Sequence, residues 1–388
     1  MAGWYRSQLH DERTAAWLGL ALGAAFGVCF LTGLWSHLAQ DPPPWFTYPA
    51  RPAGLYRVTQ GVHVVAGTAS IPLLLAKLGV VHPHLLAWPP VRSALHAVER
   101  LALLPLVGGA GFLLLSGTAN GARWYPWTFF FPRAHFWAAW ITVGGLVVHV
   151  GAKAGATRAA LRPGRRARGG EASRGEPSRR PRPPATRTPS PTDRRAFLGA
   201  VAAASGTLAL ATAGGTVSWL GPVSFLAQRR PGVGPQGLPV NKSAAAARVV
   251  DAACDPGYRL VVAGAVARPL ALSRAELAAL PQRTADLPIA CVEGWSASAR
   301  WRGVPVRHLL DLAGAAPDAE VVVESLQPRG RYRASPLNAA QAADPDTLLA
   351  LELDGEPLHL DHGYPVRLIG PNRPGVQQTK WVARLEVR

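Results

Sequence analysis

The chain has 388 residues, enough for two or three domains, and a formal net charge of +18. Thirteen Lys or Arg against three acidic residues fall within residues 153–195, and no aromatic residue interrupts them. This composition excludes a basic nucleic-acid-binding domain and indicates a local basic tail. Cys29, Cys254 and Cys291 lack the spacing of a zinc site. Thirteen tryptophans and a mean hydropathy of +0.10 indicate membrane spans.

Four apolar stretches are each close to the roughly 20 residues that cross a bilayer core. They are residues 15–38, 58–81, 97–118 and 135–153. The first is too long and too weakly flanked for a cleaved signal peptide. The basic tail after the fourth stretch predicts a cytoplasmic location for that end, which places the N-terminus inside and loops 39–57 and 119–134 outside. The aromatic residues of both loops are typical of an interfacial belt.

Four histidines lie at membrane depth, where ionisable residues usually have a function. They are His63, His96, His135 and His149. His135 and His149 are fourteen residues apart, about 21 Å of helix rise and within about 40° of one face. This spacing favours one or two haems b with two histidine ligands each, His63 with His135 and His96 with His149. The alternative is a set of interfacial histidines that are only hydrogen-bonded.

The same half of the chain carries a family resemblance. The motifs are Ser93-Ala-Leu-His-Ala-Val-Glu-Arg100, Ser116-Gly-Thr-Ala-Asn120, Trp124-Tyr-Pro-Trp-Thr-Phe-Phe-Phe-Pro132 and His149-Val-Gly-Ala-Lys153. Over about residues 10–155 the chain resembles the small four-helix b-type cytochromes that anchor molybdenum enzymes in membranes. The resemblance implies a transmembrane cytochrome domain over residues 1–155, without fixing individual haem ligands. Such a domain would contact membrane lipid and the quinone or quinol pool.

A basic linker and a second membrane-crossing signal follow. Residues 156–192 are rich in Arg, Pro, Gly and Ser, which predicts a disordered cytoplasmic linker. Arg194-Arg195-Ala-Phe-Leu then opens an apolar segment, and residues 193–221 resemble a twin-arginine signal read by the export machinery. The alternative is an ordinary fifth span. Both place the C-terminal domain on the extracytoplasmic side of a multi-pass cell-membrane protein, and cleavage of the segment stays open.

Residues 222–388 change to short strands and turns, which predicts a mixed α+β domain. Strand-like runs cover residues 258–266, 320–325, 365–370 and 380–387, a hairpin turns at Asp354-Gly355, and helices are expected near 273–280 and 305–313. The apolar run Leu287–Cys291 ends in a lone cysteine, followed by an aromatic-rich turn and a helix with Pro305 in its first turn. A buried structural thiol or a Cys254–Cys291 disulfide are the alternatives to a metal ligand.

Five ordered motifs in this domain define a second resemblance. They are Cys291 with Glu293-Gly-Trp-Ser296, Trp301-Arg-Gly-Val-Pro305, Arg331-Tyr-Arg-Ala-Ser335, Asp361-His-Gly-Tyr-Pro-Val-Arg367 and Lys380-Trp381. They are similar to the molybdopterin-binding domain of the sulfite oxidase family, above all its bacterial branch of methionine sulfoxide reductase catalytic subunits. The predicted fold is therefore an α-helical membrane bundle of four spans plus a fifth anchor span, followed by an α+β molybdopterin domain.

The resemblance implies roles for individual residues. Cys291 would ligate molybdenum through its thiolate, and Tyr332 would flank the metal. Residues expected to contact the molybdopterin are Asn241, Ser325, His362, Arg367, Gln378, Thr379 and Lys380. Turn and sheet-packing roles are the alternatives for Asn241 and Tyr332. Arg367 and Lys380 would hold the phosphate of the pterin, since a guanidinium suits phosphate oxygens.

Two departures from the family bear on function. Animal sulfite oxidases carry arginines four and five residues after the metal cysteine, whereas Trp295 and Ser296 stand here, so a sulfite-binding pocket is not evident. The family's dimerisation domain is not expected after Arg388, so we expect a monomer. The sequence predicts a membrane-bound oxidoreductase that passes electrons from quinol through haem b to molybdenum and reduces a sulfoxide or N-oxide, as a small molecule or within an oxidised protein. The alternatives are oxidation of a sulfur compound and a non-catalytic haem protein.

Overall fold

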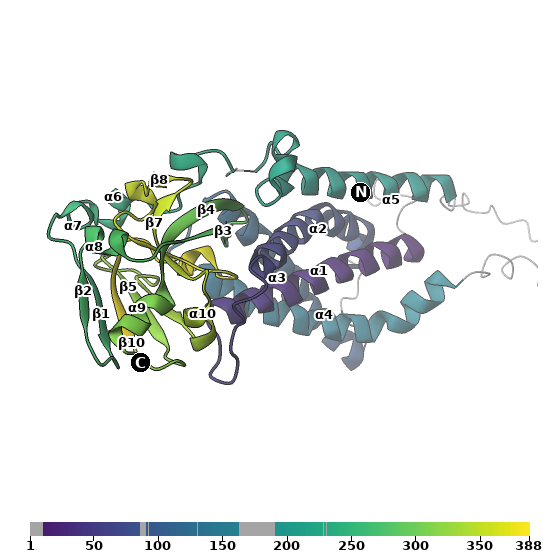
Figure 1. Ribbon diagram of the computed structural model, residues 1–388. Helices are drawn as coiled ribbons and strands as arrows, with labels where there is room; N and C mark the ends of the chain where they lie inside the picture. Colours follow the sequence, from purple (N-terminus) through teal and green to yellow (C-terminus); the bar gives the residue numbers. More distant parts are fainter. Residues whose placement is uncertain are drawn as a thin grey trace, which may run out of the picture. The chain divides into compact units, whose positions relative to one another are not determined.

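The computed structural model describes residues 11–85, 91, 93–129, 131–162, 191–227, 229 and 231–388 (Figure 1). The chain divides into two compact units. The first comprises residues 1–30, 66–120 and 124–209, and the second comprises residues 31–65, 121–123 and 210–388. The first unit is helical, and all the strands belong to the second.

Five long helices are apolar enough to cross a membrane. They are α1 Glu12–Gln40, α2 Leu55–Leu85, α3 Ala94–Gly121, α4 Phe131–Leu161 and α5 Pro191–Ala213. Four spans and a fifth were predicted, so this part of the fold class is confirmed. Residues 163–190 of the predicted disordered linker lie outside the described residues. The helix within predicted segment 193–221 ends at Ala213, before the short helix η1 Ser218–Val223.

Small residues let α3 and α4 approach closely in the first unit. A Cβ on Gly145 would lie 3.1 Å from the Ala102 carbonyl oxygen, and one on Gly109 would lie 2.1 Å from Thr142 Oγ1. Close backbone approach of this kind is how helices associate in lipid, where burial of apolar side chains gives little driving force. Glu99 of α3, three residues before Ala102, pairs with Lys153 of α4 at 2.6 Å. Packing and charge therefore hold the two helices together.

The second unit contains two five-stranded sheets. The first has the order β2-β1-β10-β5-β6, and the second has the order β3-β4-β7-β8, with β9 paired to β7. In chain order the strands are β1 Leu260–Gly264, β2 Leu270–Leu272, β3 Arg283–Ala290, β4 Ser296–Pro305, β5 Val321–Ser325, β6 Ala334–Leu337, β7 Leu348–Leu353, β8 Glu356–Pro357, β9 Arg367–Ile369 and β10 Val382–Val387. Only β1 and β10 pair in parallel within these ladders.

Short helices complete this unit. They are η2 Pro235–Gly237, α6 Ala244–Ala247, α7 Val250–Cys254, α8 Arg274–Ala279, α9 Val306–Ala313, α10 Ala339–Ala343, η3 Leu360–His362 and η4 Gly375–Gln377. Helix α9 buries Val306, Leu309, Leu310 and Ala313 along one face, and it ends at the left-handed Gly314. These side chains join β1, β5 and β10 in the largest core cluster. The core therefore lies between α9 and the first sheet.

The predicted strands, the Asp354-Gly355 hairpin and both predicted helices are present, and the mixed α+β domain is confirmed. Two local predictions are wrong. The stretch after Gly294 is not an aromatic-rich turn but strand β4, in which buried and exposed side chains alternate and Trp301 is fully buried. Pro305 precedes the first turn of α9 as its N-cap residue instead of lying within it. The alternation of small residues in Ser296–Ala299 explains the first error, because small side chains give a weak apolar signal.

Candidate active site

Cys291 lies at the end of strand β3, where the chain turns back into β4. Its backbone N–H donates to the Trp295 carbonyl at 2.8 Å, and the Gly294 N–H donates to the Cys291 carbonyl at 3.1 Å. Gly294 adopts φ +87°, a conformation that residues with a Cβ rarely accept. The tight turn fixes the cysteine between two paired strands, as the sequence predicts for a thiol at a strand end.

The Cys291 sulfur accepts two hydrogen bonds and is only 1% exposed. Asn241 Nδ2 donates to it at 2.8 Å, and the Glu293 backbone N–H donates at 3.4 Å. Burial raises the pKa of the Cys291 thiol to about 12, and the Glu293 charge adds to this effect against the two donors. The thiol is therefore neutral at physiological pH, and a bound cation would be needed to keep it as a thiolate.

Glu293 forms ion pairs with two arginines near this turn. Arg229 pairs with its carboxylate at 3.1 Å and Arg123 at 3.8 Å. The Trp295 indole N–H also donates to Glu293, at 3.3 Å. Both arginines bond the Asn241 backbone or side chain as well, so they position the residue that donates to the Cys291 sulfur. The Glu293 carboxylate thus offsets one of the two positive charges close to the cysteine.

A second cluster is cationic and deeply buried. Arg367 donates from Nη1 to the His362 carbonyl at 3.0 Å, and Lys380 Nζ donates to the carbonyls of Asp361, at 2.9 Å, and Lys242. Burial lowers the pKa of Arg367 to about 9. Burial first, and then the neighbouring Arg367, lowers the pKa of Lys380 to about 7 and that of His362 to about 4. Three basic groups therefore share one buried region.

This cluster fits an anionic cofactor group. The Arg367 Nε atom is buried and has no hydrogen-bond partner among the described residues. An unpaired buried donor on a cation is costly, so it marks a place where a ligand oxygen is expected. Gly363, with φ +115°, permits the cluster to form, because a Cβ there would lie 3.1–3.2 Å from Arg367 and Lys380. The residues present suit the phosphate of a pterin cofactor.

Three other predicted cofactor contacts have definite partners in the fold. Ser325 Oγ donates to the Lys380 carbonyl at 2.7 Å, and the Thr379 hydroxyl lies 2.6 Å from Ser335 Oγ. Gln378 uses both side-chain atoms on the backbone of Gly370, at 2.9 Å each. Ser325 and Thr379 flank the chain at Lys380, and Gln378 holds the loop after β9. Their contact with a cofactor stays a prediction.

Tyr332 lies in the turn before β6 and is partly buried. Its hydroxyl donates to Gln40 Oε1 at 3.4 Å. Burial raises the pKa of the Tyr332 hydroxyl, and the charge of Arg331 opposes this effect. The hydroxyl is therefore protonated at neutral pH and can act as a hydrogen-bond donor.

The four candidate haem ligands divide between the two units. His63 lies in the second unit, where its Nδ1 is 3.2 Å from Thr32 Oγ1. His96, His135 and His149 lie in the first. His135 Nδ1 is 3.1 Å from Ser116 Oγ. A hydrogen bond at Nδ1 fixes the orientation of a histidine ring whose Nε2 binds a metal. His63 and His135 therefore fit iron ligation through Nε2.

His96 and His149 both lie near the Glu99 carboxylate in the first unit. Glu99, paired with Lys153, interacts electrostatically with both histidines. His149 Nδ1 is buried and has no hydrogen-bond partner in the described part of the chain. His96 Nε2 accepts a 3.4 Å hydrogen bond from Arg100 Nε, which occupies the atom that would face an iron. The structure brings the predicted pair near each other, and His149 fits a ligand role better than His96.

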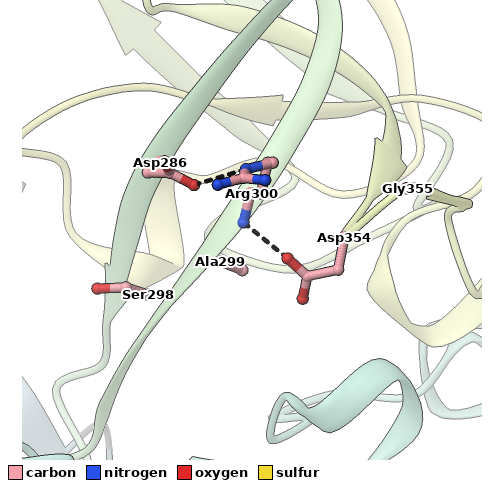
Figure 2. A pocket seen from close by; sticks show the side chains of 6 residues that line it. All are labelled: Asp286, Ser298, Ala299, Arg300, Asp354 and Gly355. Carbon is pink, nitrogen blue, oxygen red and sulfur yellow. Dashed lines mark hydrogen bonds and ion pairs between the residues drawn. The ribbon is translucent and has the colours of Figure 1, made fainter.

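The six residues that line a surface pocket on the β3–β4 hairpin include none of the candidates (Figure 2). Figure 2 shows Arg300 against Asp286, at 3.2 Å, while the Arg300 backbone N–H donates to Asp354 at 2.9 Å. These charged groups satisfy one another and leave nothing for a ligand to complete. The described residues also hold no group of three or more His, Cys, Asp or Glu side chains suited to a metal ion. A single cysteine ligand, as the family resemblance implies, requires no such group.

Several residues near Cys291 were given no role by the sequence analysis. Glu293 and its partners Arg123 and Arg229 shape the cysteine turn, and Gln40 reaches Tyr332. Glu293 is part of the cysteine motif, but its ion pairs were not predicted. Arg123 and Gln40 could not be identified from the sequence, because they come from loops and helix ends of the predicted membrane half. Cys254 and Cys291 are free, exposed and buried respectively, so the alternative disulfide is not formed.

The chain is similar to several known proteins. Residues 246–388 match the family described as oxidoreductase molybdopterin binding domain. The chain is 39% identical over 140 residues to a protein of Azospira oryzae provisionally named protein-methionine-sulfoxide reductase subunit YedZ1, covering 36% of this chain and 51% of that one. It is 31% identical over 157 residues to the mitochondrial sulfite oxidase of Rattus norvegicus, covering 34% of this chain and 29% of that one. The chain thus spans about half or less of these relatives.

The fold, the buried thiol with its cationic cluster and these similarities define an enzyme class. The C-terminal part of the chain is a molybdopterin-binding oxidoreductase domain. That domain belongs to the sulfite oxidase family, and five helices long and apolar enough to cross a membrane precede it.

Thiol labelling tests the burial of Cys291. In folded, cofactor-free protein at pH 7.5, we expect iodoacetamide to modify exposed Cys254 at least about tenfold faster than Cys291, because only the thiolate reacts. Mass spectrometry of proteolytic peptides measures both rates, and labelling in denaturant is the control in which they converge. Equal rates in the folded protein would contradict the buried, neutral thiol.

Lys380→Met tests the cationic cluster. In cofactor-free protein the unfolded lysine holds its proton up to about pH 10.5, whereas the folded one releases it near pH 7. The unfolded state thus binds more protons between those values, and stability should rise with pH across that window. In Lys380→Met this rise should disappear, and co-purified molybdopterin should fall more than about tenfold.

The measurements are the unfolding midpoint by scanning fluorimetry and the pterin content by fluorescence after oxidation. Arg302→Met is the matched control, since Arg302 is half-exposed and already paired with Glu352 at 2.8 Å. It should change neither the pH dependence nor the cofactor content. Normal pterin content in Lys380→Met would show that the cluster serves only the fold.

Proposed function

We propose that the chain is a membrane-anchored molybdopterin oxidoreductase that removes an oxygen atom from an uncharged acceptor such as a sulfoxide or N-oxide. Electrons would come from quinol by way of haem b. The observation that carries this proposal is the reduced positive charge at the cysteine. Glu293 pairs with both Arg123 and Arg229 and neutralises one of these two positive charges, and Trp295 and Ser296 occupy the positions where the animal enzymes have arginines. An anion such as sulfite therefore lacks the positive charge of those two arginines, whereas a neutral dipole does not need it.

The residues of the site have separate tasks in this proposal. Cys291 binds molybdenum, and Asn241 and the Glu293 N–H stabilise the negative charge of its thiolate. Arg367, Lys380 and His362 hold the pterin phosphate through charge-assisted hydrogen bonds. Tyr332 orients the substrate through its protonated hydroxyl. When bound, the molybdenum cofactor supplies a centre that exchanges two electrons and one oxygen atom.

The overall reaction balances without another reactant. A sulfoxide and a quinol give a sulfide, water and a quinone. The sulfur–oxygen bond breaks, sulfur is reduced by two electrons, and the two protons of the quinol equal the two that form water. Similarity to a protein named as a methionine-sulfoxide reductase subunit supports this direction. Similarity to a sulfite oxidase supports the second candidate, oxidation of a sulfur compound with electrons passed to quinone.

The membrane part serves this reaction as electron donor. We assign His63 with His135, and His149 with His96, to two haems b, supported by the Nδ1 contacts at Thr32 and Ser116 and by the buried Nδ1 of His149. A single haem would use the first pair. Quinol and membrane lipid are the partners that such a bundle requires.

The catalytic domain faces the extracytoplasmic side in this proposal. Arg194-Arg195 at the start of α5 serve as a twin-arginine signal, which suits a domain that folds around its cofactor before export. The second compact unit supports the orientation, because it contains residues 39–57 and Gly121–Arg123 together with the domain. Both stretches belong to loops that the distribution of Lys and Arg places outside.

An activity screen tests the direction of catalysis. Purified molybdenum-loaded protein with reduced methyl viologen should oxidise the dye on addition of methionine sulfoxide, dimethyl sulfoxide or trimethylamine N-oxide. Cys291→Ala should lose more than about 99% of this rate, since the metal loses its protein ligand. Molybdenum content by mass spectrometry separates loss of metal from loss of chemistry. Ferricyanide reduction by sulfite without any sulfoxide or N-oxide activity would favour the second candidate instead.

Spectroscopy tests the haem assignment. The reduced-minus-oxidised spectrum should show low-spin haem b, and the pyridine haemochrome assay should give up to two haems per chain. His135→Ala should lower that number by one, because an imidazole on one side alone holds haem weakly. His82→Ala is the matched control, since the His82 side chain is bonded to the Gly79 carbonyl at the end of α2. A protein without a b-type spectrum would contradict the assignment.

A further inference from the structure

The segment Leu31–Val65 folds as part of the second compact unit, although it joins the first two apolar helices. Asn372 clamps it from the loop after β9. Its Oδ1 accepts the Tyr56 backbone N–H at 2.8 Å, its Nδ2 donates to the Pro49 carbonyl at 2.7 Å, and its own N–H donates to the Ala53 carbonyl at 3.0 Å. Asn372 is 2% exposed, so these bonds are shielded from water.

Charged and polar contacts extend the attachment. Arg51 pairs with Asp344 at 2.8 Å and with Asp346, and Asn338 Nδ2 donates to the Tyr48 carbonyl at 3.0 Å. Gln377 Nε2 donates to the Gln40 carbonyl at 3.0 Å. The segment is therefore held at several points on the catalytic domain.

Apolar side chains of the Leu31–Val65 segment also lie close to Cys291, the proposed metal ligand. Tyr56 is 1% exposed and packs in one buried cluster with Ala290, the residue that precedes Cys291. Ala53 packs against the cluster that contains Cys291 itself. The Tyr56 phenol lies near enough to Cys291 and Tyr332 to interact electrostatically with both. A residue of α2 thus occupies a position beside the candidate metal ligand.

Polar side chains of the same segment form a hydrogen-bonded network between Tyr332 and the cysteine turn. Tyr332 donates to Gln40 Oε1 at 3.4 Å, Gln40 Nε2 donates to Ser36 Oγ at 3.2 Å, and Ser36 Oγ lies 3.2 Å from the Tyr56 hydroxyl. Ser36 also donates to Gln60 Oε1 at 3.2 Å, and Gln60 Nε2 donates to the Val292 carbonyl at 3.4 Å. Buried polar groups at this density are unusual unless they specify a structure or bind a ligand.

We propose that the Leu31–Val65 segment supplies one wall of the substrate pocket, in which the Tyr56 hydroxyl and the Gln40 amide bind the substrate oxygen opposite Tyr332. This inference rests on the proposed function and names further substrate-binding residues for that site. The pocket is then built from two stretches of chain that lie more than 200 residues apart in the sequence. Both stretches must be in place for the substrate oxygen to receive all of its hydrogen bonds.

The hydrogen-bond pattern allows such binding. Ser36 has one hydroxyl hydrogen and gives it to Gln60, so Tyr56 donates to Ser36 when no substrate is bound. Rotation of the two hydroxyls lets Ser36 donate to Tyr56 and lets Tyr56 donate to a substrate oxygen. The 3.4 Å bond from Tyr332 to Gln40 is at the long limit of a hydrogen bond, so little is lost when Tyr332 turns to the same oxygen. All these groups are uncharged, which suits a sulfoxide or an N-oxide.

Tyr56→Phe in the full-length, molybdenum-loaded chain tests the proposal. With reduced methyl viologen and dimethyl sulfoxide, we expect KM to rise about tenfold, since one hydrogen bond to the oxygen is lost, while kcat changes less than about threefold. Gln40→Met is a second variant that keeps the side-chain length and removes the amide, and it should act in the same direction. Tyr48→Phe is the matched control, because its hydroxyl lies 3.5 Å from Asn372 and not in the network.

A second measurement needs no turnover. The electron paramagnetic resonance signal of one-electron-reduced molybdenum should shift in Tyr56→Phe and stay at the wild-type position in Tyr48→Phe. If the wild type reduces no sulfoxide or N-oxide, the proposed function fails, and this signal alone decides the present inference. Unchanged KM and an unchanged signal in Tyr56→Phe would overturn it. Loss of molybdenum from both Tyr56→Phe and Gln40→Met would also overturn it, because the segment would then serve cofactor retention.

Discussion

The buried positive charge of Arg367 and Lys380 is the constraint on which the catalytic domain depends. No carboxylate side chain bonds either cation in the described residues, and their donors reach only backbone carbonyls. Charges buried in this way destabilise a fold unless a counter-ion joins them. A bound anion would therefore stabilise the domain. In the proposed function the pterin phosphate is that anion, and the cofactor would bring molybdenum to the same domain as Cys291.

At the cysteine turn, the buried charge that needs a partner is negative instead of positive. Burial keeps the Cys291 thiol protonated, and the nearby Glu293 charge adds to that tendency. Asn241 and the Glu293 N–H nevertheless point donors at the sulfur, an arrangement that favours a thiolate. A metal ion in place of the proton would satisfy both influences. In the proposed function the phosphate of the cofactor would neutralise the cationic cluster, and the molybdenum would neutralise the anionic sulfur.

The sequence predicted the parts of this arrangement that depend on local patterns. Apolar length revealed the five helices, and alternation revealed β1, β5 and β10. The five ordered motifs identified Cys291, His362, Arg367 and Lys380 as candidate cofactor-binding residues. Strand β4 was missed because Ser296, Ala297 and Ala299 carry too little apolar surface, although all three pair with β3 and are buried. Pairing between strands is a long-range effect that local alternation does not report.

The contribution of Leu31–Val65 could not be predicted for a related reason. Gln40 and Tyr56 look like the ordinary polar and aromatic residues of helix ends at a membrane surface, and nothing in their spacing connects them with residues near 291 or 332. Their role follows from Asn372, which adopts a left-handed φ of +51° and thereby directs its amide at the segment. Because Leu31–Val65 belongs to the same compact unit as the catalytic domain, the end of α1 and the start of α2 can become part of its active site.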